Sequence, residues 1–361
     1  MTSPSKHTDA PAVAGVGVAF PPHRVDQAEA RQALCALWDA HGVDYDGEWV
    51  DYFFDAVGVE TRHLALAPHR YAEFRDFGTA NNHFIEVASE LGERAIADAL
   101  EAAGVSSDDL DAIFFTTVTG VASPSIDAKI INKMKLPRTI QRTPMFGLGC
   151  VGGAAGVARM SEYLRAHPDH TAVLLSVELC SLTVERHETS IADYIAAALF
   201  ADGAAAVVGV GADKANANGH DGARLVANHS AFYHDTEWVM GWEIDEHGFG
   251  LVLSGDLPEV IETELAAEVD AFLDGHNLGR ADIRTWISHP GGPKVLQAIE
   301  SALSLEDDEL ESAWRSLSQV GNMSSASVLH VLQQEIDRDM ELPAVLMAMG
   351  PGFSAEFVLL G

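Results

Sequence analysis

The chain has 361 residues, of which 47% are hydrophobic, and its 54 acidic and 22 basic residues give a formal charge of −32. This charge disfavours binding to nucleic acids or anionic membranes, because phosphate surfaces repel it. No apolar run approaches the length that spans a bilayer, the N-terminus lacks the apolar segment of a secretion signal, and the three cysteines show neither disulfide nor metal-ligand spacing. We expect a globular cytoplasmic protein without a metal.

Short apolar runs alternate with alanine-rich stretches along the chain, and a polar, glycine-rich stretch over 211–222 interrupts this alternation. The alternation predicts an α/β architecture, and the interruption predicts two halves, 1–212 and 213–361. In chain order the expected elements are a helix over 84–103, a strand over 112–117, a helix over 150–166, a strand over 172–177, a helix over 258–273, a strand over 285–288, helices over 293–303 and 305–314, and strands over 345–349 and 356–360.

The first candidate catalytic residue is Cys150, which is embedded in the glycine-rich sequence FGLGCVGGAAG. Glycine permits a sharp turn, and a helix that starts at Cys150 would direct unpaired N–H groups and its positive dipole end at the sulfur. Both effects favour a thiolate, the form that attacks carbonyl carbon. The alternative is a small buried cysteine that merely packs beside glycine and alanine.

Two later segments each offer a further candidate at a boundary marked by glycine. The sequence WISH reads as a strand that ends in His289, and the following PGGP forces a turn into a new helix. Asn322 follows Gly321 at the start of a small-residue run that reads as another helix. Alone, these residues are also explained as a buried structural histidine and a helix N-cap. With Cys150 they form a set suited to acyl-thioester chemistry.

Each of these side chains has a distinct task in that chemistry. A thiolate on Cys150 accepts an acyl group from a thioester. His289 could hold the thiolate as an ion pair and then, together with Asn322, donate a hydrogen bond to a thioester oxygen. Two donors on one oxygen would stabilise the enolate formed by decarboxylation, and loss of one such donor costs about 3 kcal/mol. The set therefore predicts decarboxylative condensation of acyl thioesters.

Over nearly its whole length the sequence resembles the type III polyketide synthases, the chalcone synthase superfamily. The resemblance implies a thiolase-like fold whose two similar halves form a layered αβαβα core, and a homodimer. It implies loading of an acyl-CoA starter and extension with malonyl-CoA, without a cofactor, a metal or a carrier-protein domain. The segments that carry it are LGCVGG at 148–153, WISHPGGP at 286–293, GNMSSA at 321–326 and MGPGF at 349–353.

The resemblance also assigns roles to single residues. Cys150 matches the nucleophile, His289 the catalytic histidine and Asn322 the decarboxylation asparagine. Phe200 matches the gatekeeper between CoA tunnel and cavity, where its ring would shield the malonyl carboxylate from water; without the match it would read as a core phenylalanine. The implied substrate pocket comprises Phe200, Thr183, Ser123, Trp242, Leu251, Ser324, Met349, Gly350, Pro351 and Gly352.

Departures from the plant pattern bear on the substrate. Leu251 stands at the second gatekeeper position, and the usual GFGPG loop reads AMGPG at 348–352, which argues against an aromatic starter. Phrases such as VELCSLT at 177–183 are similar to the microbial alkylresorcinol and alkylpyrone synthases, so we expect a fatty acyl starter. Trp242 would then steer the poly-β-keto chain toward aldol closure, unless it is only a packing residue.

An anionic CoA conflicts with the acidic chain unless cations line the tunnel mouth. Arg62 and Lys294 are the main candidates, and Lys129, Lys133, Lys135 and Arg142 are further ones. The expected partners are acyl-CoA, malonyl-CoA and a second copy of the chain, with no nucleic acid and no membrane insertion. Alternative functions are a ketoacyl synthase III or hydroxymethylglutaryl-CoA synthase, which match the histidine and asparagine segments less well, and a catalytically silent thiolase-fold partner, which would be expected to lack the nucleophile.

Overall fold

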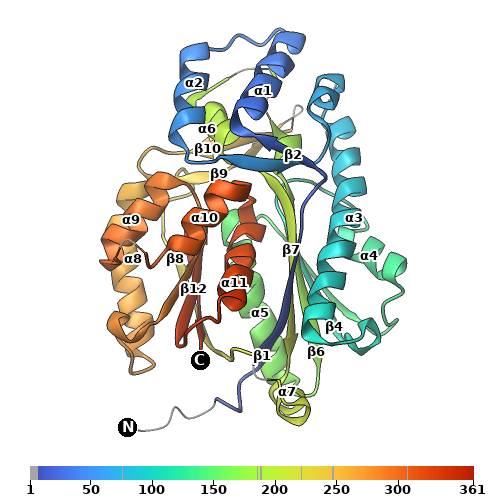
Figure 1. Cartoon of the computed structure of the whole chain (residues 1–361), viewed down its shortest axis with the longest axis vertical. Helices are drawn as coiled ribbons and strands as arrows, with labels where there is room; N and C mark the ends of the chain where they lie inside the picture. Colours follow the sequence, from blue (N-terminus) through green and yellow to red (C-terminus); the bar gives the residue numbers. More distant parts are fainter. Residues whose placement is uncertain are drawn as a thin grey trace.

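Two central β-sheets and the helices packed on both of their faces form the body of the structure (Figure 1). The structure is a computed structural model that describes residues 7–74, 76–184, 186–187, 189–220, 222–245, 248–306 and 308–361. Within these residues, no helix combines the length and apolar character needed to span a membrane.

The first sheet has five strands in the order β1-β7-β6-β4-β5. β4 runs parallel to β5 and β6, whereas β7 runs antiparallel to β6 and β1. Every residue of β4, β6 and β7 is buried, as expected of strands covered on both faces. The bounds are β1 Ala12–Ala19, β4 Ala112–Thr117, β5 Gln141–Phe146, β6 Thr171–Leu179 and β7 Asp202–Val210.

The second sheet has four strands in the order β11-β12-β13-β8. β11 is parallel to β12, and β13 is antiparallel to both β12 and β8. The series β8, β13, β12, β11 thus repeats the order and directions of β1, β7, β6 and β4, so the two halves of the chain share one topology. The bounds are β8 Leu225–Phe232, β11 Thr285–Ser288, β12 Ala344–Gly350 and β13 Ser354–Leu360.

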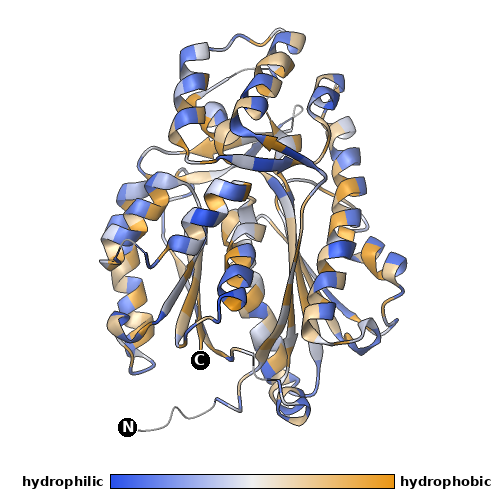
Figure 2. Ribbon diagram, in the orientation of Figure 1, coloured by the Kyte–Doolittle hydropathy of each residue, from blue (hydrophilic) through white to orange (hydrophobic). Residues whose placement is uncertain are grey.

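The helices complete a five-layered αβαβα arrangement. α5 and α11 lie between the two sheets and contact both of them. α3 and α4 cover the outer face of the first sheet, and α8 and α9 lie outside the second (Figure 1). The outer helices are banded in blue and orange in Figure 2, as expected of helices with one face toward a sheet. The bounds are α3 Phe77–Ala103, α4 Ile126–Met134, α5 Gly152–Ala166, α8 Leu257–Asp274, α9 Pro293–Leu303 and α11 Ser327–Asp337.

The helices α1, α2 and α6 gather at one end of the molecule with two small antiparallel sheets, β2-β3 and β9-β10 (Figure 1). The bounds are α1 Gln27–His41, α2 Gly47–Ala56, α6 Ile191–Leu199, β2 His23–Asp26, β3 Thr61–Leu64, β9 Met240–Ile244 and β10 Phe249–Leu253. The remaining elements are α7 Ala212–Asn218, α10 Glu311–Val320 and the 3₁₀ turns η1 Pro68–Glu73, η2 Ser107–Asp109, η3 Gly149–Val151, η4 Cys180–Thr183, η5 Arg280–Asp282 and η6 Ser324–Ala326.

The helix expected over 305–314 is wrong in its first half. α10 begins only at Glu311, and residue 307 lies outside the described residues. The backbone N–H of Glu306 donates to the carboxylate of Glu309 at 2.7 Å, so acidic side chains close a turn here instead of leading a helix. The polar stretch over 211–222 includes the short helix α7, which connects β7 to β8.

Candidate active site

Cys150 lies in the 3₁₀ turn η3, between the end of β5 and the start of α5, and is only 6% exposed. The α-helix thus begins two residues after the cysteine, at Gly152. The turn requires Gly149, which has φ +55° and whose added Cβ would lie 2.6 Å from Cδ of Pro351. Close packing by the 350–352 turn therefore fixes the loop that carries the thiol.

Asn322 is held by two hydrogen bonds that orient its carboxamide. Its Oδ1 accepts from the backbone N–H of Ser324 at 2.8 Å, and its Nδ2 donates to the carbonyl oxygen of Gly291 at 3.2 Å. The Cys150 thiol in turn donates to the Ser324 hydroxyl, with Sγ and Oγ 3.6 Å apart. The asparagine is therefore linked both to the nucleophile and to the loop that follows His289. One of its two amide hydrogens remains available for a substrate oxygen.

His289 follows the last residue of β11, and its backbone N–H donates to the carbonyl oxygen of Met347 at 3.0 Å. The side chain is 5% exposed, and neither ring nitrogen has a hydrogen-bond partner among the described residues. Burial lowers the pKa of His289 to about 3. A neutral imidazole whose backbone is fixed and whose ring nitrogens lack partners is suited to form a hydrogen bond with a group of the substrate.

The electrostatics of the site differ from the expected resting ion pair. Burial raises the pKa of the Cys150 thiol to about 12; the Ser324 hydroxyl opposes this rise, and the Glu178 carboxylate adds to it. Both the thiol and the imidazole are therefore neutral in the ligand-free site at neutral pH. Burial thus outweighs the hydrogen bonds that favour a thiolate here, those from the Ser324 hydroxyl and from the backbone of Cys150 itself.

Glu178, to which the sequence analysis gave no role, lies close enough to Cys150 to influence its thiol electrostatically. It is fully buried in β6 and accepts hydrogen bonds from the Thr119 hydroxyl at 2.8 Å, from the Val118 N–H at 3.1 Å and from the Ser325 hydroxyl. Burial raises its pKa to about 7. Glu178 is the one acidic residue in the otherwise mostly apolar strand sequence over 171–179, and this pattern could have identified it as a buried carboxylate.

Cys150, His289 and Asn322 all line one cavity of about 540 Å³. Its wall comes from α2, α6, α8, α9 and the second sheet, and apart from Cys150, His289 and Asn322 it is mainly apolar. Among the described residues that line it, Lys294 is the one lysine or arginine, and no aspartate or glutamate occurs. On α2, Trp49 and Tyr52 line it while remaining 43% and 56% exposed, so this side is its mouth. The cavity can accommodate an acyl chain of substantial length.

Family models of chalcone and stilbene synthases match the chain in two parts, the N-terminal domain at residues 5–214 and the C-terminal domain at residues 224–361. The chain belongs to this family. It is 48% identical over 351 residues to the 1,3,6,8-tetrahydroxynaphthalene synthase of Streptomyces peucetius subsp. caesius, covering 96% of this chain and 92% of the relative. It is 31% identical to a putative chalcone synthase of Bacillus subtilis (strain 168), covering 96% and 97% of the two chains.

Solved structures agree. The 1,3,6,8-tetrahydroxynaphthalene synthase of Streptomyces coelicolor A3(2), a bacterial type III polyketide synthase, superposes with a TM-score of 0.88 at 26% identity, covering 97% of this chain and 98% of that one. The protein is thus a type III polyketide synthase with a thiolase-like fold, as its sequence predicted. It is an acyltransferase of a family that needs no cofactor beyond CoA-linked substrates. Among the described residues, no group of three metal-ligating side chains could hold a metal ion.

Phe200, which the sequence predicts to be the gatekeeper, lines both the large cavity and two smaller ones. It caps the C-terminus of α6 and lines the catalytic cavity together with Met349. It also lines a cavity of about 20 Å³ with Thr183, Trp242 and Leu251. The structure therefore brings these sequence-predicted pocket residues together with Phe200, which lines both spaces.

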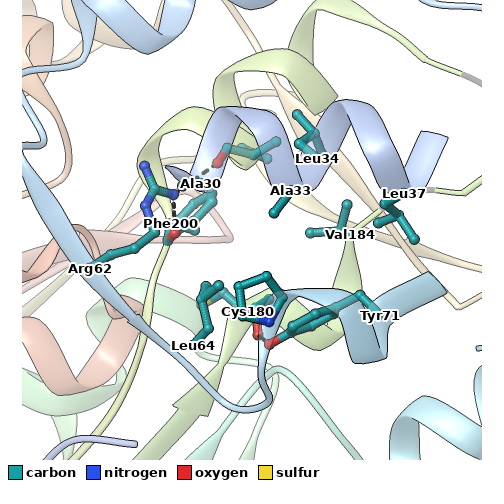
Figure 3. Close-up of a pocket in the computed structure, with 14 residues that line it drawn as sticks. Ala30, Ala33, Leu34, Leu37, Arg62, Leu64, Tyr71, Cys180, Val184 and Phe200 are labelled. Atoms are coloured by element: carbon teal, nitrogen blue, oxygen red, sulfur yellow. Dashed lines mark hydrogen bonds between the residues drawn. The ribbon is translucent and has the colours of Figure 1, made fainter. Parts of the chain in front are cut away.

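Arg62 lies away from the mouth of the synthase's cavity, contrary to expectation. It is 2% exposed, and its guanidinium donates to the carbonyl oxygens of Ala197 at 2.8 Å, of Phe200 at 2.6 Å and of Ala198. Figure 3 shows it beside Phe200 in a pocket of about 60 Å³ that Cys180 also lines. Burial lowers its pKa to about 10, which leaves it charged. Its charge is committed to the C-terminal carbonyls of α6 and is not free for CoA.

The remaining predicted residues divide between the nucleophile loop and the surface. Gly350 packs so closely on that loop that an added Cβ would lie 2.6 Å from the backbone nitrogen of Val151. Gly352 has φ +143° and faces the ring of Phe232. Ser123 is exposed and is not among the residues that line the cavities described above. Lys294 is exposed at the first turn of α9 and lines the catalytic cavity.

Proposed function

We propose that this type III polyketide synthase condenses a fatty acyl-CoA starter with several malonyl-CoA units and cyclises the product to an alkylresorcinol or an alkylpyrone. The observation that carries the proposal is the common cavity: Cys150, His289 and Asn322 line a space of about 540 Å³ whose other walls are mainly apolar. An alkyl chain gains free energy from such a wall, whereas a short acyl group would leave most of it unoccupied.

In the first step, Cys150 would transfer its proton to the neutral imidazole of His289 and attack the thioester carbonyl of the starter. The carbon–sulfur bond of the acyl-CoA breaks, and the CoA thiolate leaves with the proton that His289 returns. The low pKa of His289 opposes the first of these proton transfers and favours the second, because the buried imidazolium releases its proton readily to the CoA thiolate. The result is an acyl-Cys150 thioester and an empty tunnel.

In the second step, malonyl-CoA would occupy the tunnel with its thioester oxygen between His289 and the unused amide hydrogen of Asn322. Loss of CO₂ leaves an enolate on that oxygen, and its carbon attacks the acyl-Cys150 carbonyl and releases the sulfur. The ring of Phe200 beside the site excludes water from the carboxylate, which favours decarboxylation. Repetition lengthens the chain before cyclisation.

A second candidate function is the formation of 1,3,6,8-tetrahydroxynaphthalene from malonyl-CoA alone, and the 48% identity to the synthase of that name from Streptomyces peucetius favours it. The two candidates separate in one experiment. Purified enzyme is incubated with malonyl-CoA alone and with malonyl-CoA plus saturated acyl-CoAs of increasing length, and the products are identified by mass spectrometry. The first candidate requires products that retain the alkyl chain. Formation of the same product in every incubation, without any alkyl chain, would favour the second.

A labelling experiment tests the alternative that the protein is catalytically silent. A radioactive acyl-CoA should label the wild-type protein at Cys150 and leave the Cys150→Ala variant unlabelled. A wild-type protein that remains unlabelled with every acyl-CoA, malonyl-CoA included, would be a silent partner. We further propose that the chain consists of two halves, 1–212 and 213–361, and the repeated sheet topology supports this division. We also propose a cytoplasmic location.

We also propose that the enzyme is a homodimer joined at the edge of the first sheet. β5 is the edge strand, and most of its residues are exposed, including Phe146 at 51%. Phe232, 57% exposed, lies against Gly352, next to Pro351, which packs on the loop that carries Cys150. An exposed edge of this kind favours pairing with a second strand. The Phe146→Lys variant should elute as a monomer in light-scattering chromatography, and an unchanged mass would contradict this interface.

A further inference from the structure

A second hollow of the molecule lies beside α8 and is separate from the catalytic cavity. It is a groove of about 620 Å³ between this helix and the segment 232–238, which follows β8. No residue lines both the groove and the cavity that contains Cys150. We call it the acidic groove and define it by Tyr233, Trp238, Asp256, Glu259, Glu264 and Glu268.

The wall that α8 contributes to the acidic groove is negatively charged. Asp256, Glu264 and Glu268 are spaced by multiples of four residues, which places them in one stripe of the helix, and Glu259 lies next to this stripe. None of the residues that line the groove is a lysine or an arginine. Within the described part of the chain, the carboxylates of Glu259 and Glu264 have neither a hydrogen bond nor an ion pair. The groove therefore attracts cations.

Tyr233 gives independent evidence that the groove binds a ligand. It is only 9% exposed, its backbone N–H donates to the carbonyl oxygen of Phe353 at 3.0 Å, and the two rings stack with centroids 5.7 Å apart. A buried tyrosine normally pairs its hydroxyl group, yet this hydroxyl has no hydrogen-bond partner among the described residues. The side chain lines the groove, so a ligand there can supply the missing partner.

The surroundings of this hydroxyl favour a ligand that donates hydrogen bonds and carries positive charge. Burial raises the pKa of Tyr233 well above its usual range, and the carboxylates of Glu268 and Glu264 add to the rise. The hydroxyl therefore stays protonated, and its oxygen offers an acceptor close to two carboxylates. Glu268 also bonds to Nε2 of His229 at 3.2 Å. An ammonium group donates several hydrogen bonds and neutralises charge, so it fits this set of acceptors.

The spacing of the carboxylates selects an extended cation instead of a metal ion. Among the described residues, no three metal-ligating side chains are placed to hold one ion. Along the axis of α8, Glu268 lies about 6 Å beyond Glu264, and Glu264 lies about 12 Å beyond Asp256. In a linear polyamine, three or four methylenes separate successive nitrogens, a spacing close to one helical turn of about 5.4 Å. Successive ammonium groups can therefore meet successive carboxylates.

Trp238 supplies an aromatic surface to the same groove. Its side chain is 53% exposed, and its indole N–H donates to the carbonyl oxygen of Asp235 at 3.0 Å, which fixes the ring. An indole attracts ammonium groups through its π-electrons and also packs against methylenes. A polyamine has both kinds of group, whereas an inorganic cation has neither methylenes nor N–H donors.

We propose that the acidic groove binds a linear aliphatic polyamine, whose ammonium groups pair with the carboxylates of α8 and donate a hydrogen bond to the Tyr233 hydroxyl. The volume of the groove is in the range of small-molecule sites. This site is independent of the starter and of the product. Its Tyr233 wall stacks on Phe353, which lines the catalytic cavity, so the stacked pair lies between the two spaces.

Isothermal titration calorimetry of the full chain with spermidine tests the proposal, and a single spermidine should bind per chain. Tyr233→Phe removes the hydroxyl but keeps the stacked ring, and it should weaken binding about tenfold. Glu264→Gln removes one carboxylate and should weaken binding about twofold to fivefold. Glu262→Gln is the matched control, because Glu262 is an exposed residue of the same helix that does not line the groove. It should bind spermidine as the wild type does.

Two further ligands test the chemical class. Propylamine, with one ammonium group, should bind at least about tenfold more weakly than spermidine, because it cannot meet several carboxylates at once. Magnesium chloride should displace spermidine no better than sodium chloride of equal ionic strength, since it acts only by screening. Propylamine that binds as tightly as spermidine, or specific displacement by magnesium, would overturn the assignment of a polyamine.

The variants also separate the groove from general attraction to a chain of charge −32. Equal weakening in Glu262→Gln and Glu264→Gln, or unchanged affinity in both Tyr233→Phe and Glu264→Gln, would show that no specific site exists. The thermal unfolding midpoint of each ligand-free variant verifies its fold. If Tyr233→Phe folds poorly, the double variant Glu259→Gln/Glu264→Gln decides, and it should weaken binding more than Glu264→Gln alone. Wild-type affinity in the double variant would overturn the proposal.

Discussion

Asn322 and Phe200 are neighbours in a parallel β-bridge that joins the two halves of the chain at the active site. The Asn322 N–H donates to the carbonyl oxygen of Leu199 at 3.0 Å, and the Asn322 carbonyl oxygen accepts from the N–H of Ala201 at 2.8 Å. The bridge fixes the backbone of Asn322 relative to that of Phe200. In the proposed mechanism, the carboxamide and the aromatic ring act on the same malonyl group, one at its thioester oxygen and the other at its carboxylate.

The first prediction concerns the donor role of Asn322. In Asn322→Asp, the carboxylate still accepts from the Ser324 N–H, as Oδ1 does now, but the side chain no longer donates. Malonyl-CoA decarboxylation should fall roughly 100-fold, corresponding to about 3 kcal/mol, while acylation of Cys150 by the starter persists. Asn322→Ala should behave alike. Release of labelled CO₂ and intact-protein mass spectrometry measure the two steps, and wild-type CO₂ release in the aspartate variant would disprove the role.

The sequence predicted the parts of the site that depend on local patterns. β4, β11 and α9 have the expected bounds, because apolar runs ended by glycine and proline define them without long-range help. Cys150, His289 and Asn322 could be recognised since each stands at such a boundary. The family resemblance predicted that these three residues meet in one cavity, whereas the local patterns did not.

Other features depend on contacts that no local pattern contains. Arg62 was expected at the tunnel mouth because an anionic CoA needs cations there, yet it donates to the carbonyl oxygen of Ala197, 135 residues away in the chain. The charge state of Cys150 was expected from the helix that follows it, whereas burial by distant segments controls it. The cavity of about 540 Å³ arises between helices and strands that are separated in sequence and meet only in the fold.

The second prediction follows from the position of Glu178 close to Cys150. The Glu178 carboxylate contributes to the raised thiol pKa, and with its own pKa at about 7 it is mostly ionised at pH 8. Glu178→Gln should therefore lower the thiol pKa and increase alkylation of Cys150 by iodoacetamide at pH 8, by roughly twofold to tenfold. Asp202→Asn is the matched control, because Asp202 is also buried but does not contribute to the Cys150 shift. Equal alkylation rates in Glu178→Gln and wild type would contradict this coupling.

The third prediction is a pH dependence of stability. The pKa of His289 is lowered to about 3 in the folded protein, so between about pH 6.5 and 3 the unfolded chain binds a proton that the folded chain does not. Stability from this residue is thus complete above pH 6.5 and is lost as the pH falls. The raised pKa values of Glu178 and Asp202 act in the opposite sense, so the effect of His289 must be isolated by a variant.

His289→Gln provides that comparison. Between pH 7 and pH 5, the wild type should lose about 2 kcal/mol more unfolding free energy than the glutamine variant, as measured by urea denaturation at both values. His330, whose pKa burial also lowers, is present in both proteins and cancels. A difference between the two proteins that stays constant with pH would show that His289 titrates normally in the folded state.

The fourth prediction concerns cyclisation. Trp242 lines the cavity of about 20 Å³ behind Phe200 and packs against Phe249 with ring centroids 5.9 Å apart. Trp242→Gly enlarges this cavity and should shift products from the resorcinol toward the pyrone, because the chain is no longer held for carbon–carbon closure. Trp238→Gly is the control, since Trp238 is 53% exposed and lies outside this cavity. The ratio is read by chromatography with mass detection, and an unchanged ratio in Trp242→Gly would remove the role.

The fifth prediction separates the two cations that were expected at the CoA tunnel. Arg62 binds carbonyl oxygens of α6 in a forked arrangement that lysine cannot reproduce. Arg62→Lys should lower the free energy of unfolding by about 2–4 kcal/mol, because buried acceptors lose charged donors, and should leave the KM for malonyl-CoA nearly unchanged. Lys294→Ala should instead change the KM for malonyl-CoA and leave the free energy of unfolding unchanged. Its exposed ammonium lines the cavity mouth, so its loss should raise that KM about twofold to fivefold with no change in urea denaturation.

Salt provides the check on this assignment. An exposed ammonium attracts CoA phosphates through a field that ions screen, with a Debye length of only about 3 Å at 1 M salt. The KM difference between Lys294→Ala and wild type should therefore shrink as salt is added, whereas the instability of Arg62→Lys should persist, since its partners are buried. If high salt leaves the Lys294 difference intact, the lysine acts through the shape of the mouth. The aromatic side chains of α2 would then provide most of the recognition of CoA.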